Sequence, residues 1–384
     1  IEFGGLFMLG VPIFGYVLIP MTDFLLKRYK YRKEPIWNQE NSFIPNLIQL
    51  WPLIQFILLV YCIHAISNSG TIQIAEIIGV AFVTGIVSGS IGITFAHELM
   101  HKKANKERWL ADILMALVLY GHFRSEHLLV HHRYVGTPRD AATAKFNENF
   151  FQFLLRVIPS CFISAWNEEI TRLRKKGMKG YSLKNPFWRY SGLALVFTSI
   201  AVILGGTSGL LFFIVQALVA ILHLELANYI EHYGLRRKSL GLNKFESTKP
   251  HHSWNSNEQA SNWLLINLQL HSDHHAKSNR DFLDLQDHPI SQAPQLPFGY
   301  PVMIILSLVP PIWFKIMNPR VLAWTLYLNT VTDGGGAYYS EYNKTIDAVE
   351  GRLCIFPAFW THAHKGIVSN TETKYIATGW YVYH

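Results

Sequence analysis

Nine of the 18 histidines in this sequence lie in four short clusters, and their spacing is the strongest chemical signal in the chain. The clusters are His97 and His101; His127, His131 and His132; His232; and His271, His274 and His275. Histidines four residues apart lie on one face of a helix. Imidazole binds iron, copper, zinc and nickel, so the clusters predict a transition-metal site.

The number of histidines indicates how many metal ions they hold. One zinc ion takes about four ligands, so nine imidazoles suit two ions. Iron fits best, because the clusters adjoin apolar segments in which O₂ and a hydrocarbon both dissolve. Nearby carboxylates are predicted to accept the free ring N–H of a ligand: Glu98, Glu126, Asp140, Glu231 and Asp273. Six further histidines are predicted to be non-ligands: His64, His122, His223, His251, His252 and His288.

Apolar helices must position these histidines. Charged residues make up 16% of the chain, against about 25% in soluble domains, and roughly 20 apolar residues span a bilayer as a helix. Five segments are predicted to span: Gly4–Leu26, Ile48–Ile66, Ile74–Ala96, Tyr190–Leu204 and Gly209–Ala227. Two apolar stretches are too short to span comfortably: Trp109–Gly121 and Pro301–Phe314. The expected fold is an all-α integral membrane bundle.

Lysine and arginine mark the cytoplasmic side of membrane proteins. They follow the first, third and fifth predicted spans and precede the fourth, whereas the loops Ser67–Gly70 and Gly205–Ser208 carry no charge. This pattern places Ile1 outside, and the C-terminus and the histidine clusters on the cytoplasmic side. The first two clusters can share a site only if Trp109–Gly121 lies against the bundle without crossing the membrane.

The net charge is +8 with histidine neutral. Because basic residues flank apolar segments, we expect lipid and an acidic protein partner rather than nucleic acid. The three cysteines form no CxxC pair, which argues against a disulfide scaffold, a rubredoxin-type iron site or a zinc ribbon in this chain. The chain begins beside an apolar run with no basic leader, and we interpret its beginning as missing.

The composition changes near the C-terminus. Residues 325–384 lack long apolar helices and contain β-type segments separated by Gly334, Gly335 and Gly336. Such punctuation is typical of short strands and turns. The sequence therefore predicts a small β-rich fragment, with a boundary near Trp324.

Residues 5–323 resemble the alkane 1-monooxygenase family of membrane di-iron hydroxylases, and also xylene monooxygenase. The matching stretches are HELMHKK (His97–Lys103), GHFRSEHLLVHHRYVGT (Gly121–Thr137), NYIEHYGL (Asn228–Leu235), KPHHSWN (Lys249–Asn255), NLQLHSDHHA (Asn267–Ala276), FGYP (Phe298–Pro301) and MNPRV (Met317–Val321). The resemblance implies a multi-pass helical bundle in the bacterial inner membrane, with two non-haem irons at its cytoplasmic end. It implies hydroxylation of a terminal methyl group with O₂ as co-substrate and rubredoxin as electron donor. All nine histidines carry over as iron ligands.

The chain departs from the family pattern in three places. The family usually has six spans, so five readable spans suggest that an N-terminal helix is absent. Val130 stands where the family often has glycine, and Leu270 stands where it favours arginine. These changes bear on substrate range and partner docking more than on metal binding.

The tail resembles the C-terminal half of a prolyl-hydroxylase-like 2-oxoglutarate oxygenase. The resemblance rests on Gly351–His362 (GRLCIFPAFWTH), His364–Gly366 and Lys374–Trp380 (KYIATGW). It implies that His362 is an iron ligand and that Lys374 pairs with a 2-oxoglutarate carboxylate. The HxD sequence that supplies the other two iron ligands is missing. We therefore predict a monooxygenase domain at 1–323 and a catalytically inactive tail at 325–384, and favour a chimeric gene or assembly joint over a working fusion.

Three other functions use some of these features. A membrane fatty-acid desaturase or hydroxylase shares histidine clusters, but NYIEHYGL favours the hydrocarbon hydroxylase. A zinc metalloprotease built on His97, His101 and Glu98 would leave seven histidines unexplained. A metal transporter needs ionisable residues at mid-membrane, whereas the carboxylates in the spans lie near span ends: Asp23, Glu76 and Glu225.

Overall fold

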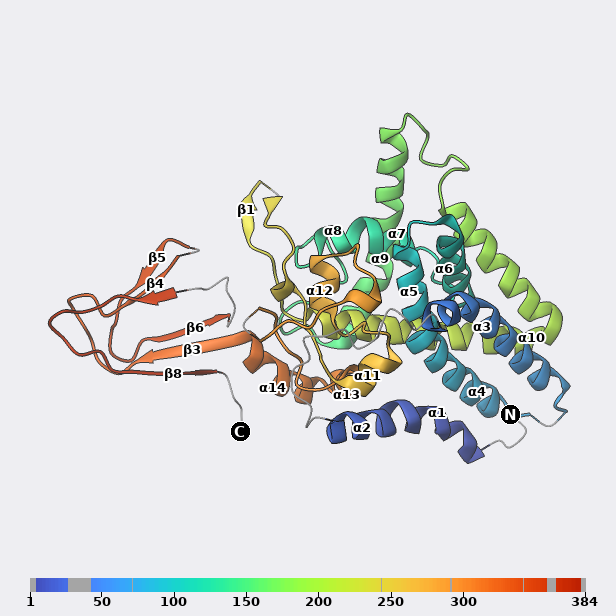
Figure 1. Ribbon diagram of the computed structural model, residues 1–384, viewed down its shortest axis with the longest axis horizontal. Coiled ribbons are helices and arrows are strands. Elements are labelled where there is room, and N and C mark those ends of the chain that lie inside the picture. The colour runs from blue at the N-terminus through green and yellow to red at the C-terminus, as the bar shows by residue number, and fades with distance from the viewer. Residues whose placement is uncertain are drawn as a thin grey trace.

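A computed structural model describes residues 5–26, 43–70, 72–242, 244–290, 292–340, 342–357 and 364–380. Gly4 and the basic residues that follow the first predicted span lie outside these ranges, as does His362. The described chain forms a mostly helical body from which a small β-rich part projects (Figure 1).

Three of the described helices are long and apolar enough to cross a membrane. They are α3 (Phe43–Asn68), the continuous helix Ile74–His101, and α10 (Phe187–His232). The second of these consists of α4 (Ile74–Val87), a π-helical turn η3 (Ser88–Gly92) and α5 (Ile93–His101). The N-terminal run η1–α1–η2–α2 (Gly5–Leu9, Gly10–Ile13, Phe14–Leu18 and Ile19–Leu26) is also apolar, and Gly10–Leu26 is shorter than those three helices.

The fourth and fifth predicted spans are the two arms of α10. Gly206 has a φ of 55° and a ψ of −140°, which no helix contains. A Cβ built on Gly209 would touch the carbonyl oxygen of Ala201, eight residues earlier, so the chain turns back on itself here. A glycine is needed because few other residues adopt this conformation. The predicted uncharged loop Gly205–Ser208 contains the turn.

The continuous helix Ile74–His101 and α10 approach each other closely at two glycines. A Cβ on Gly85 would lie 2.5 Å from Cβ of Val219, and a Cβ on Gly89 would lie 2.6 Å from Cβ of His223. Small residues allow such close packing between helices in a membrane, where no hydrophobic driving force pulls them together. The two glycines therefore fix the helices that carry the first and third histidine clusters.

The segment between the first two clusters folds back along the bundle. α6 (Asn105–Leu117) packs against α5 and α3, with one face buried among them. The chain then turns into α7 (Phe123–Glu126), the π-helical turn η4 (His127–His131) and α8 (His132–Tyr134). Trp109–Gly121 thus lies against the bundle, which is the condition under which both clusters share one site.

The helix α9 and several short elements cover the rest of the site. They are α9 (Phe150–Lys175), the β1–β2 hairpin (Ser239–Gly241 and Lys244–Phe245), η5 (Pro250–His252), α11 (Gln259–Leu264), α12 (His271–Ala276), η6 (Phe282–Asp284), α13 (Tyr300–Ser307) and α14 (Pro310–Val321). Their core contains fully buried Trp254 and Trp313 beside Tyr229 and Tyr233 of the α10 end. The stretch Pro301–Phe314, predicted to be too short to span, is divided between α13 and α14.

The β-rich part contains two three-stranded antiparallel sheets, as predicted from its composition. Their strands are β3 (Leu322–Tyr327), β4 (Ala337–Tyr339), β5 (Lys344–Ile346), β6 (Leu353–Pro357), β7 (His364–Gly366) and β8 (Ile376–Trp380). The strand orders are β6–β3–β8 and β5–β4–β7, with Trp324 opposite Ile355 and Gly379. β3 follows α14 directly, so strand structure begins two residues before Trp324.

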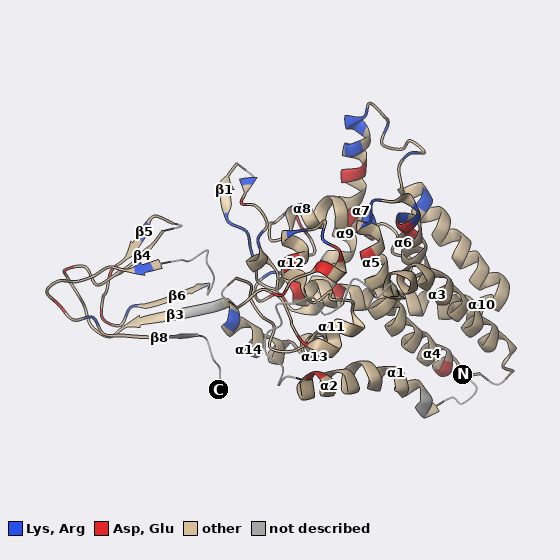
Figure 2. Ribbon diagram, viewed as in Figure 1, with Lys and Arg blue, Asp and Glu red and all other residues tan. Residues whose placement is uncertain are grey.

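Charge is unevenly distributed on the helical body. Figure 2 shows lysine and arginine at the upper ends of α9, α6 and α10, whereas α1 and the lower end of α4 show none. In the described body, lysine and arginine thus gather toward one end of α6, α9 and α10. This asymmetry is what the positive-inside rule expects of membrane helices.

Candidate metal centre

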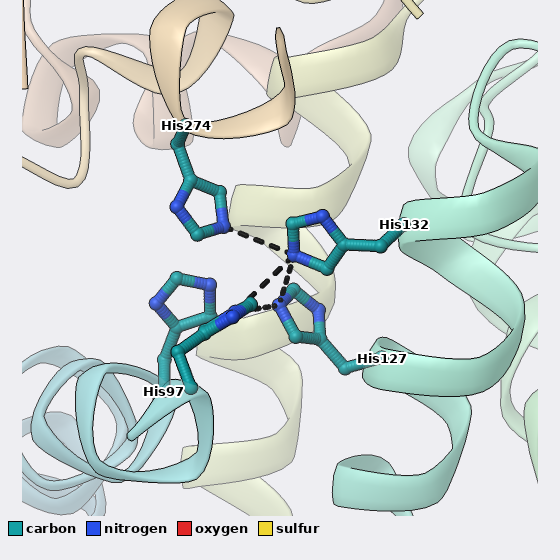
Figure 3. Close-up of side chains that lie close together, drawn as sticks. His97, His127, His132 and His274 are labelled. Atoms are coloured by element: carbon teal, nitrogen blue, oxygen red, sulfur yellow. Dashed lines mark hydrogen bonds between the residues drawn. The ribbon is translucent and has the colours of Figure 1, made fainter. Parts of the chain in front are cut away.

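Five histidines from three separate segments of the chain form the first group of candidate ligands: His97, His101, His127, His132 and His274. His132 Nε2 lies 2.9 Å from His127 Nε2, 3.1 Å from His274 Nε2 and 3.2 Å from His101 Nε2. Figure 3 shows the rings converging from α5, from η4 and α8, and from α12. Segments more than 170 residues apart in sequence thus present nitrogens to one point.

The second group contains four fully buried histidines: His131, His232, His271 and His275. His131 Nε2 lies 3.1 Å from His275 Nε2, and His271 Nε2 lies 3.2 Å from His232 Nε2. The groups adjoin each other, because the sequence neighbours His131 and His132 belong to different groups, as do His274 and His275. The structure therefore brings all nine predicted residues together; their role as ligands stays a prediction.

The π-helical turn η4 explains how one cluster serves both groups. In an α-helix, His127 and His131 would share a face, as their spacing predicts, and His132 would point away. In η4 the N–H of His132 bonds the carbonyl of His127, five residues earlier. This wider turn brings His127 and His132 into the first group and places His131 in the second. Such π-bulges occur mostly at functional sites.

The nitrogen spacing fits a metal ion better than hydrogen bonding between rings. When two nitrogens each bind a metal at about 2.1 Å and lie at right angles about it, the nitrogens are about 3.0 Å apart. The observed separations of 2.9–3.2 Å match this value. Burial also lowers the pKa of His127, His132, His271, His274 and His275 well below the usual range. These rings are therefore neutral, which is the metal-binding form.

Asp140 makes the contact predicted for it. Its Oδ2 accepts from His131 Nδ1 at 3.0 Å and from the Thr143 hydroxyl at 2.7 Å, and its Oδ1 accepts from the Ala142 amide. Burial works to lower the pKa of His131, but the Asp140 carboxylate outweighs it and raises the pKa to about 9. The contact fixes the proton on Nδ1 and turns Nε2 toward His275, the arrangement expected of a metal-bound histidine.

The other four carboxylates behave differently from the prediction. Glu231 approaches a ring, but its Oε2 lies 3.3 Å from His271 Nε2, the nitrogen that faces His232. Glu98 instead pairs with Lys102 at 2.6 Å. Glu126 bonds the thiol of Cys161, and burial raises its pKa to about 8.

Asp273 is the fourth of these carboxylates. It contacts Arg280, the Gln286 amide and His288 Nε2, the last at 3.0 Å. It therefore ties α12 to the loop that follows it and bonds none of the nine rings. His288, predicted to be a non-ligand, is one of its partners. Helical spacing alone could not distinguish these roles, because they depend on loops distant in sequence.

An apolar cavity leads from the membrane helices to the metal centre. Its walls come from η3 and α5, from α10 and from α13, and it reaches His97, His127 and His271. His223 also lines it and bonds the hydroxyl of Tyr16 in η2. Sequence reasoning gave His223 no role in the site. The signal was available, because His223, Ala227 and Glu231 repeat every four residues and all line the cavity.

Comparison with known proteins agrees with this geometry. The family model for fatty acid desaturase matches residues 75–306. Alkane 1-monooxygenase 2 of Alcanivorax borkumensis is 37% identical over 326 residues, which cover 81% of both chains. The chain belongs to the alkane 1-monooxygenase family.

Other relatives extend the match. The alkane 1-monooxygenase of Ectopseudomonas oleovorans is 41% identical over 250 residues, and the match spans 65% of this chain and 61% of that protein. The hydroxylase component XylM of a Pseudomonas putida xylene/toluene monooxygenase is 27% identical over 335 residues, or 84% of this chain and 85% of XylM. With three membrane-capable helices, this family member is a membrane protein with a histidine-rich metal site.

The Asp140 contact generates the first testable prediction. Asp140→Asn removes the charge and lets the amide N–H₂ face the ring, which favours the tautomer with its proton on Nε2. Loss of such a contact lowers metal affinity by about 10–100-fold. Metal content after dialysis against a chelator measures the effect. Glu148→Gln is the control, because Glu148 pairs with Arg156 away from the nine rings. Equal metal retention in the two variants would contradict the role of Asp140.

Proposed function

We propose that this chain hydroxylates the terminal methyl group of an alkane or related hydrocarbon to a primary alcohol, using two iron ions and O₂. The proposal rests on one observation: an apolar cavity reaches the place where the nine histidines lie together. The names of the relatives support the reaction and the substrate class.

The two histidine groups would each hold one iron ion. Five imidazoles in one group and four in the other suit ions that accept five or six ligands, and leave positions open for O₂. When bound, the iron pair supplies O₂ activation and transfers one oxygen atom to a C–H bond. Glu231 reaches the second group at His271 and is the carboxylate best placed to join it.

The protein's own part is to bind the hydrocarbon, orient it and exclude water. The cavity wall is largely apolar, with Ile93, Leu224 and Ile304 among the residues that face the substrate. A substrate dissolved in the bilayer can enter between the helices without crossing water. Its terminal methyl group then lies beside His97 and His271, at the inner end of the cavity.

The reaction needs electrons, and we propose rubredoxin as their source, with rubredoxin reductase upstream. The excess of basic residues at one end of the helical body supports an acidic partner (Figure 2), since opposite charge speeds encounter at low salt. By the positive-inside rule this end is cytoplasmic. The bacterial inner membrane is the corresponding location, and a helical bundle in which this chain supplies about five spans is the corresponding architecture.

We further propose that residues 1–323 carry the activity and that the tail at 325–384 contributes no chemistry. Lys374 lies close to Gly366 of β7, but residues 325–384 contain no HxD triplet of the kind that supplies two iron ligands in a 2-oxoglutarate oxygenase. The full chain should therefore release no CO₂ from labelled 2-oxoglutarate while it hydroxylates alkane, and Lys374→Ala should hydroxylate at the unchanged rate. Release of CO₂ that Lys374→Ala abolishes would overturn this assignment.

Iron stoichiometry tests the two-group division. Purified chain should contain two irons, and His274→Ala and His271→Ala should each lose at least one, because each truncates a different group. Alkane turnover should fall below one hundredth in both variants. His64→Ala, an exposed histidine of α3 outside both groups, should keep both irons. Full iron content in the double variant His274→Ala/His275→Ala would sink the proposal.

The substrate test separates the alkane hydroxylase from the membrane fatty-acid desaturase or hydroxylase, which the family-model match keeps as an alternative. Cells that express the chain with rubredoxin and its reductase should convert an alkane series to 1-alkanols. Acyl lipids in the same cells should gain no double bond or hydroxyl group. Acyl products without 1-alkanols, measured by gas chromatography, would favour the alternative.

A further inference from the structure

A second, polar pocket lies at the basic end of the helical body, away from the nine histidines. It has a volume of about 420 Å³ and is lined by residues of α6, α7, η4 and α9, of the loop before α10, and of the start of α10. Five of its side chains are cationic (Arg108, Arg124, Arg172, Lys184 and Arg189) and two are anionic (Asp112 and Glu169). The pocket thus carries an excess of three positive charges.

The two carboxylates form ion pairs with three of the arginines that line the pocket. Asp112 is buried between Arg124 and Arg189, at 2.9 Å and 2.8 Å. Glu169 pairs with Arg172 at 2.6 Å. Within the described part of the chain, no carboxylate pairs with Arg108 or Lys184. Arg108 Nε donates to the Lys102 carbonyl at 2.8 Å, which leaves its terminal N–H groups and the Lys184 ammonium for an anionic ligand. The paired arginines position the wall around it.

The surroundings of the pocket are those of a membrane interface. The apolar arm of α10 starts at its rim, and the side chains there are exposed and amphipathic or apolar: Trp109, Tyr181, Leu183 and Trp188. Arg189 lies over the ring of Trp109, 4.7 Å from its centroid. Tryptophan and tyrosine gather at the level of lipid headgroups. Trp109, Leu128 and Leu129 contribute apolar surface to the same pocket.

We propose that this pocket binds the phosphate headgroup of an anionic phospholipid, with the glycerol and upper acyl chain against its apolar wall. Basic pockets between membrane helices on the cytoplasmic side bind such headgroups. Arginine matches phosphate by paired hydrogen bonds, and lysine adds a point charge. Figure 2 shows basic residues at the neighbouring ends of α6 and α10, and both helices contribute residues to the pocket.

The bound lipid also touches the turn that carries metal ligands. Ser125, Leu128 and Leu129 line the pocket, and their neighbours on α7 and η4 include His127. An occupied pocket therefore supports η4 from the side opposite to the metal centre. Lipid binding thereby stabilises the folded protein, and this effect is measurable without turnover.

The test uses the purified full chain in mixed micelles and measures its melting temperature as lipid is added. Phosphatidylglycerol should raise the melting temperature, whereas phosphatidylcholine and millimolar inorganic phosphate should not. Lys184→Glu should need at least fivefold more phosphatidylglycerol for half the effect, because one cation near an anionic headgroup is worth roughly fivefold in affinity. Lys176→Glu is the matched control, an exposed lysine of the same loop region outside the pocket.

A second variant, Arg108→Gln, guards against a folding defect in the first and should need severalfold more lipid. Identical lipid dependence in wild type and both pocket variants would overturn the proposal. An equal shift in Lys176→Glu would also overturn it, since the effect would then be one of surface charge. Stabilisation by inorganic phosphate alone would show a free-anion site and exclude the lipid. None of these readings depends on iron or on alkane turnover.

Discussion

The structure depends on holding nine imidazoles so close that their nitrogens lie about 3 Å apart across two groups. Nitrogen lone pairs that face one another repel, and burial denies them water, so a cation bound between them would stabilise the arrangement. The protein therefore needs rigid helices to hold the rings against this repulsion. It also needs Asp140 to fix a proton on the outer nitrogen of His131. Metal binding and folding of the centre are coupled for this reason.

Each unusual backbone feature of the body serves that convergence. Gly85 and Gly89 bring the helix of His97 and His101 against α10, which carries His232. Because α6 packs back against α5, it brings the second cluster (His127, His131 and His132) to the end of α5. The π-turn η4 then places His131 in one group and the other two histidines in the other. Removing any one of these features would displace at least one ring from its group.

The sequence was sufficient to predict which histidines lie together, but not which of them belong to each of the two groups. Several multi-histidine clusters in one apolar chain are typical of a metal centre, and the uncharged Gly205–Ser208 marked the α10 turn. An α-helical spacing argument grouped His127 with His131, because a π-turn has no simple sequence signature. The contacts of Glu98, Glu126 and Asp273 were mispredicted for a related reason. A carboxylate that neighbours a ligand in the sequence need not touch that ligand. The actual partners of Glu98, Glu126 and Asp273 are Lys102, Cys161 and His288. Closeness in the sequence does not identify these partners.

The two pockets divide the membrane helices between separate tasks. The apolar cavity is lined by residues of the membrane helices and reaches the rings, so it favours molecules without charge. The cationic pocket lies at the opposite side of α7 and η4 and selects a charged headgroup. A hydrocarbon and a phospholipid both have long apolar chains. The two pockets thereby distinguish the uncharged methyl end of the hydrocarbon from the charged headgroup of the phospholipid. An enzyme surrounded by lipid needs this sorting, because lipid chains outnumber dissolved alkane and would otherwise fill the substrate cavity.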